Sequence, residues 1–351
     1  MPQETFIKES KGSSVIDQVG IDARTVQDRT DLSFFKHKRI LVTGASGIIG
    51  TNFLTVLASQ SQGKSAEIHA ITKSGKFPVE LSDAVKPLVM DLTDPVEVSR
   101  LGQYDFILHA AGYGQPGKFL HAPLKTMELN VGLTASLIEK MNPNGTFVFI
   151  STSEIYSGLT EPPFNEDQVG TTNTNHPRAS YIEGKRSGEA IVAIAKRELG
   201  LDAKSLRLAL AYGPGTKDGD ERVLNTFVEQ ALHSKSIKLR DSGDAWRTYC
   251  YVSDAVQMIL DAALHGDSDI YNIGGKSRIQ IKELARLIGK LTGATVEIPE
   301  GTNSPFVGAP DDVWLDLSKI EQISNLEHLV TLEDGIERTI SWRKSALQVK
   351  N

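Results

Sequence analysis

The sequence predicts an α/β fold built on a doubly wound parallel sheet, and two observations lead to this prediction. Short apolar runs of the kind found in buried parallel strands alternate with helical patterns over roughly the first half of the chain. Such alternation is typical of a parallel sheet with helices on both faces. In addition, a glycine-rich turn, Gly44-Ala45-Ser46-Gly47-Ile48-Ile49-Gly50, directly follows the first run. The expected strands, in chain order, are residues 38–43, 67–71, 87–90, 106–109 and 146–150.

The glycine turn predicts a dinucleotide site. Gly44 permits a tight turn, Gly47 lets the backbone approach a pyrophosphate, and Gly50 allows the following helix to pack closely on the strand. The helix expected at residues 49–58 would direct its first N–H groups and its positive potential at the phosphates. A lone glycine triplet is a weak signal, but a strand before it and a helix after it supply the required context. We therefore predict a Rossmann nucleotide-binding fold.

Composition limits the remaining possibilities. A chain of 351 residues with 40% hydrophobic and 23% charged residues can form one large domain or two closely merged ones. A net charge of −6 gives no electrostatic footprint for nucleic acid. The single cysteine, Cys250, excludes an internal disulfide and a thiolate metal cluster, and the scattered histidines offer no metal-ligand spacing. No apolar run is long enough for a membrane span, and no signal-peptide core is present, so we expect a cytoplasmic protein without a metal or membrane partner.

The alternation of strands and helices loosens after Tyr212-Gly213-Pro214-Gly215, which suggests a second lobe for substrate. Residues before the first strand are polar and lack periodicity, which suggests a mobile or loosely docked arm. The predicted organisation is an N-terminal arm at 1–36, a dinucleotide-binding domain at 37–212 to which 245–275 return, and a smaller mixed α/β lobe at 213–244 and 276–351.

Tyr181 and Lys185 are the strongest candidates for catalysis. They lie one helical turn apart, so both side chains project from the same face of a helix. A phenol has a reference pKa of about 10, but a neighbouring ammonium stabilises the phenolate. Such a tyrosine can take a proton from a hydroxyl while hydride leaves the same carbon for a nicotinamide. The pair is weak evidence alone and gains its weight from the glycine turn.

A polar cluster, Ser151-Thr152-Ser153-Glu154, follows the strand at 146–150. In open α/β sheets, ligands bind at the carboxyl ends of the strands. Hydroxyls and a carboxylate at that edge could hold a sugar or a small polyol, whereas the alternative is a polar turn at the strand end. Together with Tyr181 and Lys185, the cluster favours a binding site.

From about residue 38 to its C-terminus, the chain resembles extended short-chain dehydrogenases that act on nucleotide sugars, and among them it is most similar to the UDP-glucuronate decarboxylase (UDP-xylose synthase) group. The matching segments are the glycine turn, Met90-Asp91-Leu92, Leu108-His109-Ala110-Ala111, Pro123-Leu124-Lys125-Thr126 with Asn130, Ser151 to Tyr156, Arg178 to Arg186, Tyr212-Gly213-Pro214, Glu221-Arg222-Val223, Arg247 to Asp254 and Asn272-Ile273-Gly274.

The resemblance implies a catalytic set of Thr152, Glu154, Tyr181 and Lys185. Tyr181 would take the proton of the hydroxyl at sugar carbon 4, and Thr152 would share a hydrogen bond with that oxygen. Lys185 would lower the pKa of Tyr181 and bind the nicotinamide ribose, and Glu154 would carry a proton or position water. The 4-keto intermediate makes a carboxyl at carbon 6 labile, and hydride then returns from the same cofactor.

The resemblance also implies binding residues. Those for the nucleotide sugar are Arg247 and Arg222, as bidentate anion contacts, with Ser153 and Tyr113. Those for the dinucleotide are Gly44, Ser46, Gly47, Ile48, Ile49, Gly50, Lys73, Asp91, Leu92, Ala110, Ala111, Asn130, Tyr181 and Lys185.

Three departures from the decarboxylase pattern keep alternatives open. The stretch Ala70 to Lys76, after the second strand, has no acid and two lysines, which leans toward NADP over NAD, although a solvated basic loop would look the same. The loop Ala111 to Pro116 and Gly215 also differ where substrate contacts are expected. A 4,6-dehydratase, a 4-epimerase or a ketoreductase therefore stays open. A catalytically silent NAD(P)-binding regulatory protein is the non-enzyme alternative, but it would not need intact Thr152, Tyr181 and Lys185.

The resemblance further implies a homodimer formed through two helices. In this chain they would be residues 124–141 and 181–199. The second has Ile191, Val192, Ile194 and Ala195, which is more apolar surface than one buried stripe needs.

Overall fold

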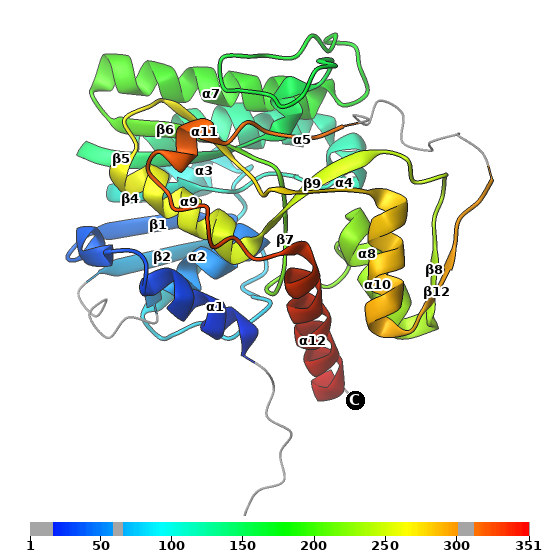
Figure 1. Ribbon diagram of the computed structural model, residues 1–351. Helices are drawn as coiled ribbons and strands as arrows, with labels where there is room; N and C mark the ends of the chain where they lie inside the picture. Colours follow the sequence, from blue (N-terminus) through cyan, green and yellow to red (C-terminus); the bar gives the residue numbers. More distant parts are fainter. Residues whose placement is uncertain (1–16, 59–65, 301–311, 351) are drawn as a thin grey trace, which may run out of the picture.

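The computed structural model describes residues 17–58, 66–300 and 312–350 (Figure 1). Seven strands form one sheet in the order β10-β6-β5-β4-β1-β2-β3, and every neighbouring pair is parallel. The doubly wound parallel fold is thus confirmed. The strands of this sheet are β1 (Arg39–Thr43), β2 (Glu67–Thr72), β3 (Val85–Val89), β4 (Tyr104–His109), β5 (Met141–Thr152), β6 (Asp202–Leu208) and β10 (Ile270–Ile273).

The strand order reverses beside β1, which lies between β2 and β4. Connections leave β1 and β4 in opposite directions at such a point, so a crevice opens at the carboxyl ends of the two strands. The glycine turn lies there because it follows Thr43, the last residue of β1. The fold therefore places the predicted dinucleotide turn at the crevice.

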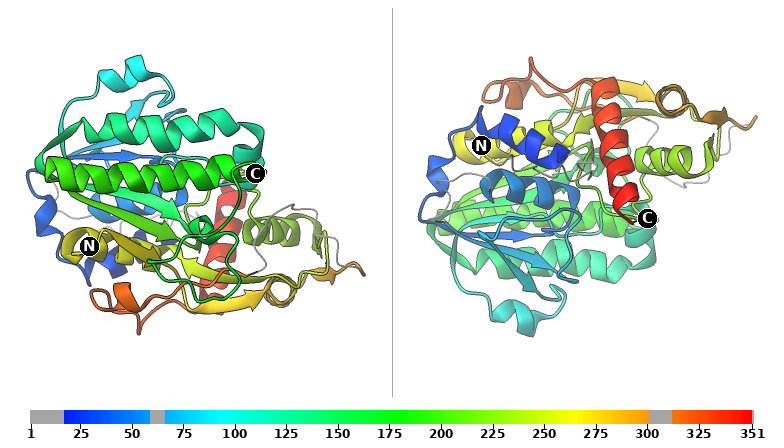
Figure 2. Two further views of the ribbon diagram at one scale, coloured as in Figure 1. Left: turned by 90° about the horizontal axis from the view of Figure 1, so that it is seen from above. Right: turned by 90° about the horizontal axis from the view of Figure 1, so that it is seen from below.

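Helices cover both faces of the sheet (Figure 2). Side chains alternate along β4: Phe106 and Leu108 enter one apolar cluster, and Ile107 enters the other. The first face is covered by α1 (Gln18–Gln27), α2 (Ile48–Ala58) and α9 (Val252–His265). The second is covered by α3 (Pro95–Ser99), α6 (Leu133–Ile138) and α7 (Ala179–Leu199), and α5 (Pro123–Met127) packs against α7. Burial on both faces explains why these strands are continuous apolar runs in the sequence.

A third apolar cluster holds the smaller lobe together, at the lower right of Figure 1. Its sheets are formed by β7 (Leu210–Tyr212), β9 (Trp246–Tyr251) and β11 (Ser277–Gln280), and by β8 (Ser236–Lys238) and β12 (Thr295–Glu297). Its helices are α8 (Val223–Ser234), α10 (Ile281–Thr292) and α12 (Leu332–Lys350). Shorter elements are η1 (Leu32–Phe35), α4 (Pro116–His121), η4 (Ser153–Tyr156) and α11 (Ser318–Glu321).

The prediction of a mobile or loosely docked arm is wrong for residues 17–36. Helix α1 begins after Asp17, whose carboxylate accepts the N–H of Gly20 at 2.9 Å. Val19, Ala23 and Val26 are buried, and α1 packs against α2 and α9. These three residues have the spacing of one helical face, a signal that the polar composition of the segment concealed. Residues 1–16 lie outside the described residues.

The helix predicted at residues 124–141 is present but irregular, and it ends at Ile138. The structure divides it into α5, a π-helical turn at Glu128–Gly132 and α6, and Met141 is already the first residue of β5. Asn130 Nδ2 donates to the Thr126 carbonyl at 2.8 Å, and Thr134 Oγ1 donates to the Asn130 carbonyl at 2.6 Å. These side chains compete for carbonyls of the helical ladder, which accounts for the irregular turn.

Two further findings concern the described part of the chain. No helix there is long and apolar enough to cross a membrane. Within the same residues, no three His, Cys, Asp or Glu side chains gather in a way that could hold a metal ion.

Candidate active site

The structure brings Tyr181, Lys185 and Thr152 together. Helix α7 carries the first two, and both are buried where the helix packs on β5. The Tyr181 hydroxyl is hydrogen-bonded to Thr152, at the end of β5. Lys185 Nζ donates to the Ile150 carbonyl at 2.6 Å. The helical spacing seen in the sequence therefore produces a shared site at the carboxyl edge of the sheet.

Burial dominates the electrostatics of this group. Desolvation raises the pKa of Tyr181 to about 12, and the hydrogen bond with Thr152 opposes that rise. Desolvation also lowers the pKa of Lys185 to about 7. Lys185 is not among the groups that lower the pKa of Tyr181 in the polypeptide by itself, because removal from water penalises both charged forms. A further positive charge is needed to make Tyr181 an effective base.

A glycine-rich loop passes over the two side chains. A Cβ atom at Gly112 would lie 3.4 Å from Asn130 Oδ1 and 3.6 Å from Lys185 Nζ, and one at Gly114 would lie 3.9 Å from the Tyr181 hydroxyl. Among the described residues, the buried Asn130 Oδ1 has no hydrogen-bond partner. A buried acceptor of this kind is costly unless a ligand group satisfies it. Asn130 Oδ1 is therefore a candidate ligand-binding atom beside Lys185 and Tyr181.

The glycine turn lies against Ala110 and Ala111, as the dinucleotide prediction requires. Gly44 has a φ of +65°, and a Cβ atom there would lie 2.4 Å from the Ala110 carbonyl oxygen. A Cβ atom at Gly50 would lie 2.5 Å from the Gly44 carbonyl oxygen. The first turn of α2 therefore packs directly on the glycine turn. The backbone closeness and the following helix N-terminus fit the pyrophosphate of a dinucleotide. Ser46 and Ile49 are buried within this turn, and Ile48 is the first residue of α2.

The residues predicted for the adenosine side also meet. Lys73, just after β2, forms an ion pair with Asp91 at 2.6 Å. The hydrogen bond from Lys73, with further bonds from Thr93, lowers the pKa of Asp91 to about 2. Leu92 and Tyr113 pack as half-buried side chains against one apolar cluster, and Tyr113 is close enough to Lys73 to influence its pKa. Tyr113 therefore lies within electrostatic range of Lys73, and its role at the sugar stays a prediction.

Arg178 was missed by the sequence reasoning, yet it fixes Glu154. Arg178 Nε donates to Glu154 Oε2 at 2.9 Å, and Nη2 donates to Glu154 Oε1. The arginine is 4% exposed, so the pair lies largely out of water. Glu154 follows Ser153, which begins η4 and is half-buried. The Glu154 carboxylate, which was predicted to carry a proton, is thus held in a bidentate ion pair at the N-terminus of α7.

Phe119, on α4, was not predicted either. Its ring is parallel to that of Tyr181, with centroids 4.7 Å apart and an interplanar angle of 3°. The Arg178 guanidinium lies 5.0 Å from the Phe119 centroid. Phe119 therefore contacts both the Tyr181 ring and the guanidinium of the Glu154–Arg178 pair. No sequence signal distinguishes this phenylalanine from an ordinary core residue.

Arg222 and Arg247 approach the site from the smaller lobe. Arg222 donates to Asp220 with Nε at 2.9 Å and with Nη2 at 2.8 Å, and its charge acts on Tyr181. Arg247 lies on β9 and donates to the Trp246 carbonyl at 2.7 Å. Both guanidiniums act on the buried Tyr249, opposing the rise in its pKa. The two predicted anion contacts therefore gather on the side of the site that faces the smaller lobe.

A buried ion pair lies one helical turn beyond Lys185. Glu189 accepts from Ser151 Oγ at 2.6 Å and from Arg207 Nη2 at 2.9 Å. Arg207 Nη1 also donates to the carbonyls of Glu166 and Gln168, both at 3.0 Å. The network joins α7, β5 and β6 to the long segment that precedes Arg178. The sequence signal for this network is Glu189, which lies four residues after Lys185 on α7.

Comparisons with known proteins show which proteins the chain is similar to. A sequence model of the NAD dependent epimerase/dehydratase family matches residues 40–274. UDP-glucuronic acid decarboxylase 1 of Xenopus tropicalis is 28% identical over 331 residues, which cover 90% of this chain and 75% of that protein. UDP-glucuronic acid decarboxylase 6 of Arabidopsis thaliana is 27% identical over 318 residues, covering 88% and 89%.

Solved structures show the same fold. UDP-glucose 4-epimerase of Thermotoga maritima superposes with a TM-score of 0.75 at 25% identity, over 88% of this chain and 99% of that one. UDP-glucuronic acid 4-epimerase of Bacillus cereus superposes with a TM-score of 0.72 at 23% identity, over 89% and 99%. The predicted resemblance to extended short-chain dehydrogenases is confirmed, and the chain belongs to the NAD dependent epimerase/dehydratase family.

Proposed function

We propose that the protein is an NAD(P)-dependent enzyme that transiently oxidises a nucleotide sugar at carbon 4, and that its reaction is decarboxylation of UDP-glucuronate. The observation that carries the proposal is the hydrogen-bonded Tyr181–Thr152 pair beside Lys185, at the crevice that the glycine turn borders. The decarboxylases of Xenopus and Arabidopsis support the choice of reaction.

The chain's own residues would manage the proton of the substrate hydroxyl. Tyr181 takes that proton through its phenolic oxygen, and Thr152 orients the oxygens by hydrogen bonding. A bound nicotinamide supplies the hydride acceptor and the positive charge that the buried tyrosine needs. Lys185, whose pKa lies near 7, adds charge when protonated, and Asn130 Oδ1 offers an acceptor beside it.

The later steps follow from the chemistry of the keto sugar. A ketone at carbon 4 is β to the carboxyl at carbon 6, so the bond to that carboxyl breaks with its electrons entering the enolate. Carbon dioxide leaves, carbon 5 takes a proton, and hydride returns to carbon 4. Glu154, held by Arg178, is the carboxylate that would carry the proton or position water. Arg222 and Arg247 would hold the diphosphate and the ring.

Product analysis separates this reaction from its rivals. We expect UDP-glucuronate to yield carbon dioxide and a UDP-pentose, measured by gas release and mass spectrometry beside UDP-glucose, GDP-mannose and dTDP-glucose. Loss of water would instead indicate a 4,6-dehydratase, and an unchanged mass with a new retention time would indicate a 4-epimerase. If no nucleotide sugar in the panel is converted, the silent regulatory alternative replaces this proposal.

We further propose that NADP(H) binds at least as well as NAD(H). The residues from Thr72 to Lys76 include no acid, and Lys73, Ser74 and Lys76 would meet a 2′-phosphate. Fluorescence titration should give an NADPH dissociation constant no higher than that of NADH. Lys73→Gln should weaken NADPH binding and spare NADH, because Lys73 would otherwise turn from Asp91 to the phosphate. A tenfold preference for NAD(H), about 1.4 kcal/mol, would contradict this.

A homodimer through α5, α6 and α7 is the proposed assembly. Helices α5 and α6 pack beside α7, at the top of Figure 2, left. Their outer surface carries Leu124, 79% exposed, Ile194, 48% exposed, and Leu199, 61% exposed, while Val192 faces the core. Light scattering at micromolar concentration should give twice the chain mass, and Ile194→Glu should halve it. A wild-type monomer would refute the assembly.

A further inference from the structure

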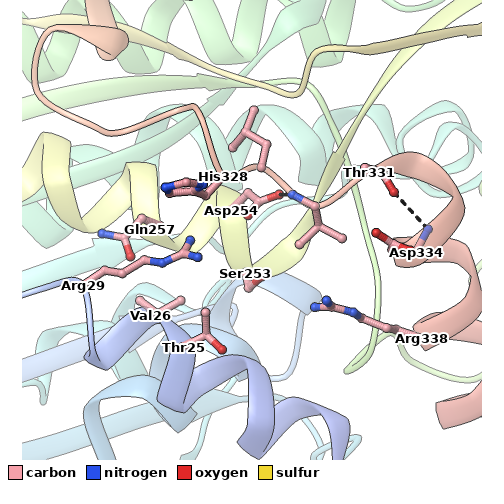
Figure 3. A pocket seen from close by; sticks show the side chains of 12 residues that line it. Thr25, Val26, Arg29, Ser253, Asp254, Gln257, His328, Thr331, Asp334 and Arg338 are labelled. Atoms are coloured by element: carbon pink, nitrogen blue, oxygen red, sulfur yellow. Dashed lines mark hydrogen bonds between the residues drawn. The ribbon is translucent and has the colours of Figure 1, made fainter.

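A cavity of about 310 Å³ lies away from the residues assigned above (Figure 3). Its walls come from α1 and the turn after it, from the first turns of α9, from residues 328–331, and from the first turns of α12. Helices α1 and α9 cover one face of the sheet, whereas α7, with Tyr181 and Lys185, covers the other. None of the proposed catalytic, cofactor or sugar contacts lines the cavity.

Hydrogen-bond acceptors form the floor of this cavity. Gln257 is 9% exposed, and its Nε2 donates to Thr30 Oγ1 at 2.6 Å, but its Oε1 is buried with no partner among the described residues. Asp254 is 6% exposed and accepts the Val330 N–H at 2.8 Å. Burial raises the pKa of Asp254 to about 6. A ligand with several O–H groups would satisfy Gln257 Oε1 and share a hydrogen bond with Asp254.

Two arginines also line the cavity. In Figure 3 the Arg29 and Arg338 side chains point toward the cavity from opposite sides of Ser253, and the charges of both reach Asp254. Among the described residues, the Arg29 guanidinium forms no hydrogen bond or ion pair. The only ion pair of Arg338 within those residues is with Asp22, at 3.3 Å. The N-terminus of α9, a helix of 14 residues, adds positive potential beside Ser253.

We propose that this cavity binds a small phosphate monoester of a polyol. The phosphate lies between Arg29 and Arg338, whose planar guanidiniums match its oxygens, and the hydroxyls donate to Gln257 Oε1 and Asp254. The volume is at the lower end of ligand pockets, so it suits a hexose phosphate and excludes a whole nucleotide sugar. Because the ligand would contact α1, α9 and α12 together, binding also stabilises the docking of the N-terminal helix.

Calorimetric titration of the full chain tests both halves of the ligand. The probes are glucose 1-phosphate, inorganic phosphate, which lacks the hydroxyl donors, and glucose, which lacks the anion. We expect glucose 1-phosphate to bind at least tenfold more tightly than phosphate and to raise the melting temperature of the protein. Glucose should neither bind measurably nor raise the melting temperature. No heat from glucose 1-phosphate at millimolar concentration would overturn the proposal.

Two variants locate the binding. Arg29→Gln should weaken glucose 1-phosphate binding at least tenfold, whereas Arg24→Gln should not, because Arg24 is also exposed, on α1 shortly before Arg29, but does not line the cavity. Arg222→Gln, in the proposed sugar site, should keep the wild-type affinity. If instead Arg222→Gln abolishes binding and Arg29→Gln retains it, the hexose phosphate occupies the sugar site and the cavity proposal is wrong. That result would leave the proposed function intact.

Discussion

Replacing Tyr181 with phenylalanine is expected to lower turnover by about three orders of magnitude or more while leaving the fold and cofactor affinity unchanged. The variant loses the hydroxyl that hydrogen-bonds Thr152 and would take the substrate proton, but it keeps the ring that stacks on Phe119. Steady-state rates on the converted nucleotide sugar, with cofactor titration in parallel, measure the two effects separately.

Tyr104→Phe is the matched control for that experiment. Tyr104 is also buried, and its hydroxyl hydrogen-bonds His69 at 2.8 Å at the opposite end of β4 from the crevice. Its loss should cost some stability and leave turnover within a few-fold of wild type. If Tyr181→Phe behaves like Tyr104→Phe, the phenol of Tyr181 is not the proton acceptor.

Replacing Arg207 with methionine should destabilise the protein by about 3–5 kcal/mol, because Glu189 would be left as an unpaired charge in the interior. The Arg207 side chain is 2% exposed, so solvent screens the pair very little. Chemical denaturation followed by circular dichroism gives the free energy of unfolding. Arg286→Met, which removes an exposed partner of Glu283, should change it by less than about 1 kcal/mol.

A double-mutant cycle separates the ion pair from simple loss of packing. Glu189→Leu combined with Arg207→Met removes both charges, and the double variant should be less destabilised than the sum of the two single variants. Additive losses would show that Glu189 and Arg207 do not stabilise each other.

Glu189 also raises the pKa of Lys185 against burial, so Glu189→Gln should move the alkaline limb of the rate profile to lower pH.

Much of the parallel-sheet domain with its glycine turn could be predicted, because the sequence patterns that indicate it are local. Buried parallel strands have a continuous apolar pattern, and Gly44 needs a conformation and a closeness to Ala110 that a side chain would forbid. Helical spacing alone placed Tyr181 and Lys185 together. The docked α1 was missed because its apolar residues are few and lie within a polar segment.

The rest of the site depends on contacts between distant segments. Phe119 reaches Tyr181 from α4, and Arg207 reaches Glu189 from β6, and neither contact has a periodic trace in the sequence. The rise in the pKa of Tyr181 has a similar origin. Neighbouring residues can be read from spacing, but the depth of burial that raises the pKa depends on every element packed around the phenol.

The fate of the hydrogen on carbon 4 tests the central claim most directly. UDP-glucuronate carrying deuterium at carbon 4 would be turned over in ordinary water, and the product analysed by mass spectrometry. Transient oxidation by one bound cofactor predicts that the deuterium leaves carbon 4 as hydride and returns to it, so the UDP-pentose keeps the label and no reduced cofactor accumulates. Loss of the label to solvent, or its stoichiometric appearance in released NAD(P)H, would contradict the account.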